Sequence, residues 1–270
     1  MNYVLRRPFV KRAFVFFLAM MLLVAGVAAA EDTQLRGYIK GQGYKFVQFG
    51  TYPYDRKGNV EPVLWRVLEL QDEKMLLLSE YVIDMQQVIF ESDKKIIEAH
   101  SYRRIKDYVE SDLYPWMNTV ALDTLLGDSP MRNALIEEPG GGKFFILTDE
   151  QFMNPAYGFP PAKMGEHKAR TASPTPYAKS RGVYEHSNGK SPYWVNFIKG
   201  ETDYKLQIVG YDGHMSMGAY TRTNVGIRPS VRLDMSMLEV VSGTGTRKDP
   251  FVFEYVGETD VSVASGEELE

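Results

Sequence analysis

Cysteine is absent from the 270-residue chain, and this absence removes much of protein chemistry at once. Disulfides, thiolate metal sites, iron–sulfur clusters and cysteine nucleophiles are all excluded. Charged and hydrophobic residues make up 24% and 44% of the chain, values close to globular averages, which argues against whole-chain disorder and against a bundle of membrane helices. The length favours one or two domains with a sizeable core.

Catalytic motifs are missing as well. The four histidines stand at positions 100, 167, 186 and 214, and no two have the i, i+2 or i, i+4 spacing that presents two imidazoles to one metal ion. The nucleophile motif G-x-S-x-G and the phosphate-binding P-loop are absent, and adjacent acidic residues point apart on a helix or strand. The sequence favours a non-catalytic protein without a cofactor. Calcium stays open because carboxylate and amide side chains accompany the late strands.

The first thirty residues have the pattern of a secretory signal peptide. Residues 1–12 hold four basic residues and no acid, an uncharged run follows from 13 to 30, and the small residues Ala28 and Ala30 fit a cleavage site. Cleavage there makes Glu31 the first mature residue and places the protein outside the cytoplasm, in the periplasm, at the cell surface or secreted. An uncleaved membrane anchor is the alternative, because a spanning helix needs about 17–25 residues.

Removal of this segment makes the chain clearly acidic. The 27 remaining basic residues (31 less 4) face 35 acidic ones, so the net charge falls from −4 to −8. An acidic surface without a lysine or arginine cluster repels polyphosphates and anionic membranes. Nucleic acids are therefore not expected as partners, and after cleavage neither is stable insertion into a membrane.

Composition divides the chain into four parts. Residues 1–30 are the signal peptide, 31–43 an N-terminal linker, 44–255 a single globular α+β domain and 256–270 an acidic, disordered tail. Hydrophobic alternation and turn residues predict strands at 44–50, 62–70, 75–79, 144–147, 193–198, 204–209, 215–221, 226–233 and 251–255. Helices are predicted within 91–138, one of them capped by Ser111 and a shorter one at 131–137, and a capping box at Thr148 opens another. The expected fold is mainly antiparallel strands with a few helices.

The proline-rich loop over 154–182 and the aromatic late strands are the parts most typical of a binding surface. Compact domains keep loops of this length mainly for functional or linking roles. Tyrosine rings stack on sugar faces, while amides and carboxylates hydrogen-bond to hydroxyl groups. Trp194 is expected in the core. We predict ligand contacts at five residues, which are Tyr193, Asn196, Tyr211, Asp212 and His214.

Several short motifs follow one another in a distinctive order. They are F-G-T-Y-P at 49–53, E-P-x-x-W-R-V-L-E at 61–69, L-L-L-S at 76–79, W-M-N at 116–118, F-I-L-T at 145–148, P-T-P-Y-A at 174–178 and G-I-R-P-S at 226–230. As an ordered set over residues 44–235, they resemble a bacterial family of exported proteins, domain of unknown function 6273. Through its tryptophan-rich late strands and G-x-R-P ending, that family is similar to the C-type-lectin-like fold of sulfatase-modifying factors. The resemblance implies a C-type-lectin-like core.

Two departures limit what this resemblance implies. Members of the family usually read W-W-L-R-S where this chain has Y-W-V-N-F at 193–197, so an arginine and a serine are missing here. The sulfatase-modifying relatives use paired cysteines or a copper centre, and another branch uses an iron triad of histidines. A chain without cysteine and with scattered histidines matches neither, and the resemblance therefore implies no oxidase activity.

The expected function is recognition of a glycan or a cell-envelope protein by an exported, non-catalytic domain. An enzyme acting on cell-wall polysaccharide is one alternative, and it needs two carboxyl groups about 5–9.5 Å apart in a cleft. A structural or assembly subunit of the envelope is another, and it would present a flat apolar patch instead of a concave site.

Overall fold

The computed structural model describes residues 34–86, 113–139, 142–195, 207–217 and 224–257. Internal contacts divide the chain at Arg36, and the fold below is that of Arg36–Glu270 within the described residues. Several sequence expectations lie outside the described residues. They are the signal peptide at 1–30, the helical pattern over 91–112 with its Ser111 cap, the predicted contact Asn196, the predicted strand residues 196–198, 204–206 and 218–221, and residues 258–270 of the acidic tail.

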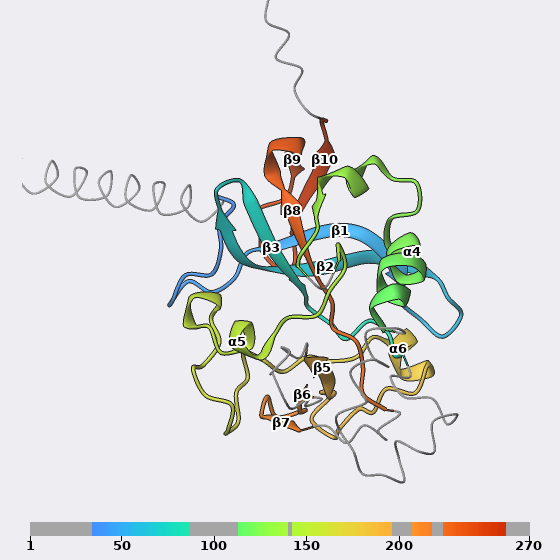
Figure 1. The fold of residues 1–270 in the computed structure, drawn as a ribbon, viewed down its shortest axis with the longest axis vertical. Helices are drawn as coiled ribbons and strands as arrows, with labels where there is room; N and C mark the ends of the chain where they lie inside the picture. Colours follow the sequence, from blue (N-terminus) through green and yellow to red (C-terminus); the bar gives the residue numbers. More distant parts are fainter. Residues whose placement is uncertain (1–33, 87–112, 140–141, 196–206, 218–223, 258–270) are drawn as a thin grey trace, which may run out of the picture. The chain divides into compact units, whose positions relative to one another are not determined.

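A seven-stranded sheet forms the larger part of the domain (Figure 1). Its order is β4-β8-β3-β2-β1-β10-β9, and all neighbouring strands are antiparallel except β1 and β10. The strands are β1 (Phe46–Pro53), β2 (Val60–Gln71), β3 (Lys74–Ser79), β4 (Leu135–Ile136), β8 (Ser230–Asp234), β9 (Leu238–Ser242) and β10 (Phe251–Tyr255). The predicted class, α+β with mainly antiparallel strands, is confirmed.

The hairpin of β2 and β3 supplies the centre of the core. Its turn consists of Asp72 and Glu73, both with positive φ (49° and 58°), which suits a two-residue turn between twisted antiparallel strands. Trp65 on β2 is fully buried, and its indole Nε1 donates to the carbonyl of Phe49 at 2.8 Å. The four apolar residues of β3 are buried on both faces, as their unbroken run in the sequence predicts.

Short helices connect the strands. They are η3 (Met117–Ala121), α4 (Leu122–Leu126), η4 (Pro130–Ala134), α5 (Asp149–Phe152), η5 (Pro155–Tyr157), α6 (Pro176–Ser180) and η6 (Met235–Met237). The helix α4 packs closely on β1, because a Cβ at Gly50 (φ 65°) would lie 2.7 Å from the Leu125 side chain. The predicted capping box at α5 is present, with Thr148 and Gln151 bonded to each other's backbone N–H groups.

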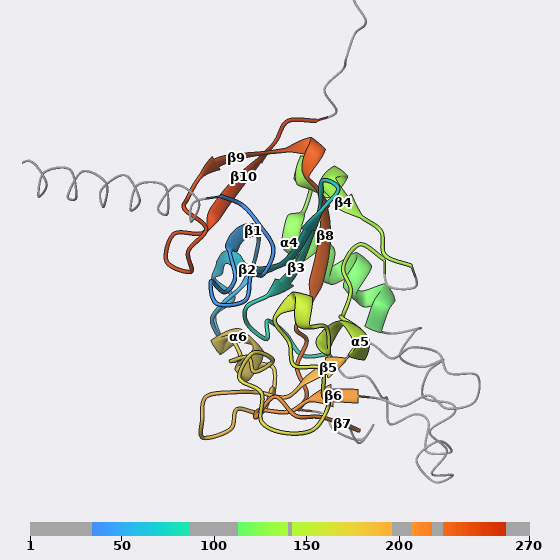
Figure 2. The ribbon, with the colours of Figure 1, turned by 90° about the vertical axis from the view of Figure 1, so that its left-hand side faces the viewer.

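A second, three-stranded sheet lies at the end of the domain opposite β9 and β10 (Figures 1 and 2). It contains β5 (Tyr193–Val195), β6 (Gln207–Val209) and β7 (Met215–Met217), all antiparallel. The chain leading into β8 ties it to the larger sheet, since the Trp194 N–H donates to the carbonyl of Gly226 at 3.0 Å. Trp194 is buried, as expected.

Four sequence expectations are corrected. Residues 131–137 form no α-helix: η4 ends at Ala134 and β4 follows it, because Leu135 pairs with β8. Residues 144–147 are buried, but only Phe145 pairs, with Ser230, so they form no continuous strand. The strand predicted at 226–233 begins at Ser230. The helix α6 lies inside the predicted loop; Thr175 followed by Pro176, an N-cap with proline at the first helical position, was its signal.

The folded domain begins before residue 44. The Tyr38 N–H donates to the carbonyl of Leu68 at 3.1 Å, and Gly37 lies so close to β2 that an added Cβ would stand 3.0 Å from its backbone. Residues 36–43 therefore pack on the sheet, where the sequence suggested a linker. None of the helices in the described part of the chain has the length and hydropathy of a membrane-spanning segment.

Candidate functional site

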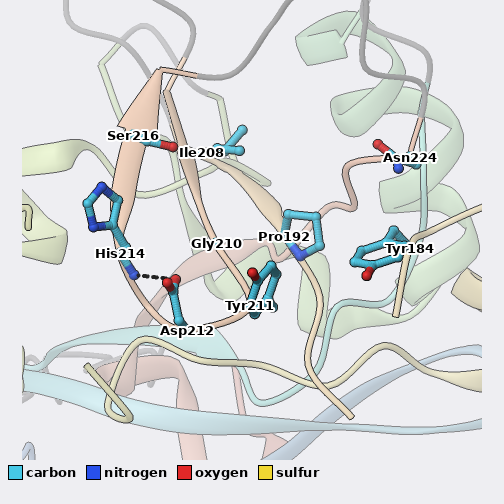
Figure 3. Close-up of a pocket in the computed structure, with 9 residues that line it drawn as sticks. All are labelled: Tyr184, Pro192, Ile208, Gly210, Tyr211, Asp212, His214, Ser216 and Asn224. Carbon is cyan, nitrogen blue, oxygen red and sulfur yellow. Dashed lines mark hydrogen bonds between the residues drawn. The ribbon is translucent and has the colours of Figure 1, made fainter. Parts of the chain in front are cut away.

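A concave site with a volume of about 340 Å³ lies on the three-stranded sheet (Figure 3). We name it the tyrosine pocket; its lining residues are Tyr184, Pro192, Ile208, Gly210, Tyr211, Asp212, His214, Ser216 and Asn224. Ligand pockets in proteins span about 300–1,000 Å³, so this one has room for a small group, such as one unit of a larger ligand.

The turn between β6 and β7 forms one wall of the tyrosine pocket and is fixed by the proline-rich loop. Gly213 has φ 84°, and a Cβ there would lie 2.1 Å from the carbonyl oxygen of His167. The His167 N–H donates to the carbonyl of Asp212 at 2.8 Å, and the His214 N–H donates to the Asp212 carboxylate at 3.0 Å. The close approach of loop and turn is possible only because residue 213 has no side chain.

The ring of Tyr211 is held in place yet remains accessible. It stacks on the His186 imidazole, with ring centroids 3.8 Å apart and an interplanar angle of 6°. The Asn188 side-chain amide donates to the Tyr211 carbonyl at 3.2 Å, which fixes the backbone below the ring. Tyr211 is nevertheless 38% exposed and Tyr184 is 43% exposed. Two aromatic rings are therefore available to a ligand at little cost in conformational entropy.

Polar groups accompany these rings. Asp212 supplies a carboxylate, Asn224 an amide and Ser216 a hydroxyl, and Figure 3 shows Tyr211 between Asp212 and Tyr184. Among the described lining residues there is no lysine or arginine. The combination of exposed rings with hydroxyl, amide and carboxylate groups suits a ligand that is rich in hydroxyl groups and carries no negative charge.

The five residues predicted to contact a ligand do not lie together in the structure. Tyr211, Asp212 and His214 come together in the tyrosine pocket. Tyr193 is fully buried in the core, so it offers no surface to a ligand. Asn196 lies outside the described residues. Sequence reasoning did not select Tyr184 and Asn224, which only the tertiary structure brings beside Tyr211.

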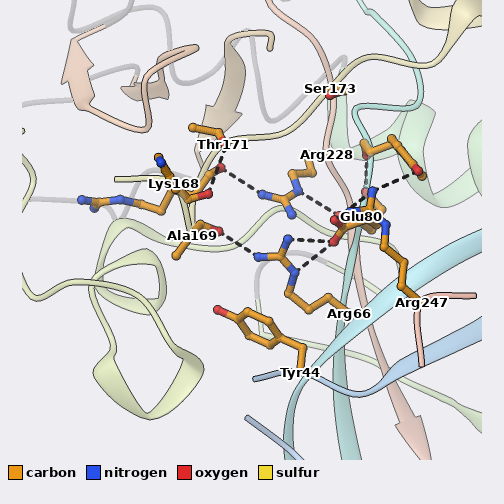
Figure 4. Close-up of polar contacts among 12 residues, drawn as sticks. Tyr44, Arg66, Glu80, Lys168, Ala169, Thr171, Ser173, Arg228 and Arg247 are labelled. Carbon is orange, nitrogen blue, oxygen red and sulfur yellow. Dashed lines mark hydrogen bonds and ion pairs between the residues drawn. The ribbon is translucent and has the colours of Figure 1, made fainter. Parts of the chain in front are cut away.

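Tyr193 instead belongs to a buried polar cluster around Arg228, and Figure 4 shows Arg228 beside Glu80 and Arg66. Arg228 is fully buried and donates to the Ser79 carbonyl at 2.8 Å, the Arg170 carbonyl at 3.1 Å and the Tyr193 hydroxyl at 3.1 Å. The Tyr193 hydroxyl in turn donates to the Arg170 carbonyl. Burial raises the pKa of Tyr193, while nearby Arg228 acts in the opposite direction. The arginine of the G-I-R-P-S motif therefore joins distant segments of the core.

A buried ion pair extends this cluster toward the surface. Arg66 donates through Nε and Nη2 to one Glu80 carboxylate oxygen at 3.0 and 2.7 Å, and through Nη1 to the Ala169 carbonyl at 2.8 Å. Its guanidinium also lies over the Tyr44 ring, 4.4 Å from the centroid. Glu80 and Arg66 are each 8% exposed at the side chain. Such contacts are typical of a structural cluster, because no ligand can reach these atoms without opening the core.

Neither the search for a metal site nor the comparison with known proteins assigns a function to this chain. Within the described part of the chain, no group of three or more histidine, aspartate or glutamate side chains is placed to hold a metal ion. No family model, curated protein or solved structure matches the sequence.

Proposed function

We propose that the protein is a non-catalytic module that recognises a neutral glycan through the tyrosine pocket. The observation that carries the proposal is the presence of two exposed tyrosines, Tyr184 and Tyr211, at one concave site with a carboxylate, an amide and a hydroxyl. Sugar rings present apolar C–H faces that pack on aromatic rings and hydroxyl groups that need hydrogen-bond partners. The Asp212 carboxylate and the acidic character of the chain disfavour an anionic ligand.

Recognition is favoured over hydrolysis by the acid content of the pocket. Hydrolysis of a glycosidic bond uses two carboxyl groups on either side of the bond. Among the described lining residues, Asp212 is the one carboxylate. A single acid can bind a sugar hydroxyl but does not provide the pair that the mechanism needs.

The proposal also includes export and fold kinship. Cleavage after Ala30 would release a domain beginning at Glu31, and N-terminal sequencing of the protein recovered from cells that express the full chain tests this directly. Kinship with the family of domain of unknown function 6273, and through it a C-type-lectin-like core, is supported by the ordered motifs alone. An alignment of relatives that keeps a tyrosine or tryptophan at positions 184 and 211 would support a shared binding surface in that family.

Binding is tested by thermal unfolding of the protein purified from cells expressing the full chain. Neutral cell-wall glycans are added with and without calcium, because a ligand that binds only the native state raises the unfolding midpoint. We expect a glycan-specific increase that Tyr211→Ala abolishes and Tyr211→Phe largely keeps, since phenylalanine retains the stacking ring. Tyr255→Ala is the control: Tyr255 is partly exposed and lies outside this pocket.

Two outcomes would overturn the proposal. One is the absence of any increase across the glycan panel. The other is an increase that persists in Tyr211→Ala, which would place the ligand elsewhere. Capture of an envelope protein by a surface that includes Tyr211, without any glycan binding, would favour protein recognition instead.

A further inference from the structure

A second pocket, with a volume of about 220 Å³, lies where five segments meet. We name it the Arg247 pocket. Its walls come from β1 and the residue after it, the start of β2, the segment that follows β3, Thr175 and the loop between β9 and β10. Among the described residues it shares no lining residue with the tyrosine pocket. The residues used below are Gln48, Tyr54, Glu61, Tyr81, Arg247 and Lys248.

The loop that carries Arg247 is anchored to the sheet. Gly243 and Gly245 have φ values of 90° and 73°, and a Cβ at Gly243 would lie 2.0 Å from the Pro250 carbonyl oxygen. The Phe46 N–H donates to the Gly245 carbonyl at 2.9 Å, which fastens the loop to β1. These contacts hold Arg247 at the rim of the pocket before any ligand binds.

Arg247 is oriented by its neighbours but remains open to solvent. Its Nη2 donates to the Tyr81 hydroxyl at 3.1 Å and lies 3.4 Å from a Glu80 carboxylate oxygen. The guanidinium also lies 5.6 Å from the Tyr81 ring centroid. The Arg247 side chain is still 53% exposed and is therefore accessible to a ligand. An arginine held in this way loses little entropy when an acidic group binds.

Glu80 is shared between Arg247 and the buried Arg66, so its single charge does not offset Arg247 alone. Arg66 donates twice to the carboxylate from the buried side, and fully buried Arg228 adds a further positive charge nearby. Lys248 stands next to Arg247, is exposed and forms no ion pair among the described residues. Against these two cations the described lining contains one acid, Glu61, which leaves a net charge of one positive unit. The sign is opposite to that of the chain as a whole.

The remaining lining groups suit a sugar ring. Tyr54 and Tyr81 supply aromatic surface, and the Tyr81 hydroxyl accepts a hydrogen bond from Arg247, which leaves its own proton for a ligand. The Gln48 side-chain amide has no hydrogen-bond partner among the described residues. Aromatic surface together with an unpaired amide and a hydroxyl donor matches a polyhydroxylated ring more closely than a bare inorganic anion.

We propose that the Arg247 pocket binds the carboxylate of an acidic sugar, with Arg247 and Lys248 contacting the carboxylate and the tyrosines contacting the ring. One net positive charge balances the single charge of a carboxylate, whereas it only half balances a phosphate dianion, which Glu61 would also repel. The planar guanidinium matches the two carboxylate oxygens. The site is independent of the tyrosine pocket, because its residues and the charge of its ligand are different.

Isothermal titration of the protein purified from cells expressing the full chain tests this site. The probes are an oligogalacturonate, the corresponding neutral oligogalactose, acetate and inorganic phosphate. We expect the oligogalacturonate to bind, with an affinity that falls as salt increases. Arg247→Gln should weaken binding by about tenfold or more, and Lys248→Gln by a smaller factor. Lys57→Gln, a change at an exposed lysine outside the pocket, should leave the affinity unchanged.

Further variants separate the two pockets. Tyr211→Ala should not alter oligogalacturonate binding, so failure at one pocket is distinguishable from failure at the other. The proposal is overturned if no uronate binds, if neutral oligogalactose binds equally well, or if both Arg247→Gln and Lys248→Gln keep the original affinity. Equal binding of acetate would overturn the assignment to a sugar, and equal binding of phosphate the assignment to a carboxylate. If Arg247→Gln does not fold, Lys248→Gln still provides a test, because Lys248 is exposed and its substitution should not disturb the core.

Discussion

Tyrosines and charged groups occur both in the buried polar cluster and in the tyrosine pocket, but they meet different partners. In the buried cluster, Arg228 and Tyr193 are fully buried and bonded to backbone carbonyls. In the tyrosine pocket, Tyr211 and Tyr184 are 38% and 43% exposed. Arg228 of the G-I-R-P-S motif and Tyr193 of β5 therefore stabilise the fold, while Tyr184 and the turn between β6 and β7 supply the accessible rings.

Of the three substitutions described here, Arg228→Met should lower the stability of the protein most. The substitution leaves the Ser79 and Arg170 carbonyls and the Tyr193 hydroxyl without their shared donor inside the core. We expect the free energy of unfolding to fall by about 3 kcal/mol, measured by urea denaturation. Arg56→Met, at an exposed arginine, is the control and should change stability by less than about 0.5 kcal/mol. Equal stability of the two variants would show that the cluster is not a stabilising element.

Gly213→Ala should have an intermediate effect on stability. It tests whether the proline-rich loop fixes the turn that forms one wall of the tyrosine pocket. Its Cβ would collide with the His167 carbonyl, so the turn and the proline-rich loop must separate. Gly189→Ala is the matched control: its φ is 74°, but nothing lies within 4 Å of an added Cβ. We expect the control to lose about 1 kcal/mol from the left-handed backbone, and Gly213→Ala to lose more, together with glycan binding. Denaturation and glycan titration of both variants provide the check, and identical behaviour would contradict a fixed turn.

Asp84→Asn should have the smallest effect on stability. It concerns a second buried polar contact, in which a carboxyl group pairs with a tyrosine. Tyr52 donates to Asp84 at 2.7 Å, and burial raises the pKa of Asp84 above its ordinary 3.8, although Tyr52, Met85 and Arg181 oppose the shift. A raised carboxyl pKa stabilises the fold fully below the unfolded-state value, and this stabilisation is lost as the pH rises through the folded-state value.

The Asp84→Asn variant lacks this titration. Its unfolding free energy should therefore improve relative to the unmodified protein as the pH increases from acid to neutral. Urea denaturation of both proteins at matched pH values measures the difference. A difference that stays constant, or that changes in the opposite direction, would contradict the raised pKa.

Much of the large sheet could be predicted from local sequence. The run of apolar residues in β3, the turn at Asp72 and Glu73, and the capping box at Thr148 act through neighbouring residues, and the structure contains all of them. The errors have long-range causes. Leu135 becomes a strand because β8 offers it a partner, and the buried residues near Phe145 find only one pairing position. Local propensity contains no information about such partners.

The difference between local signals and long-range contacts also applies to the residues of the candidate sites. A tyrosine next to Trp194 gave no sign in the sequence of being enclosed by Arg228 and Arg170, so Tyr193 was chosen as a contact. Tyr211 and Asp212 lie together at the tyrosine pocket because they are neighbours in the turn between β6 and β7, and their role as ligand contacts stays a prediction. Tyr184 and Asn224 are not part of that turn, and only folding brings them close to it.

By itself, the sequence determined the features that depend on composition or on adjacent residues: the absence of thiol chemistry, the acidic charge, the α+β class and the turn that carries Tyr211 and Asp212. The tertiary structure alone decided which polar residues became core and which faced a pocket. It also placed two basic residues of the β9–β10 loop beside Tyr54 and Tyr81. The physical reason is that exposure and charge balance depend on contacts between segments that are far apart in the chain.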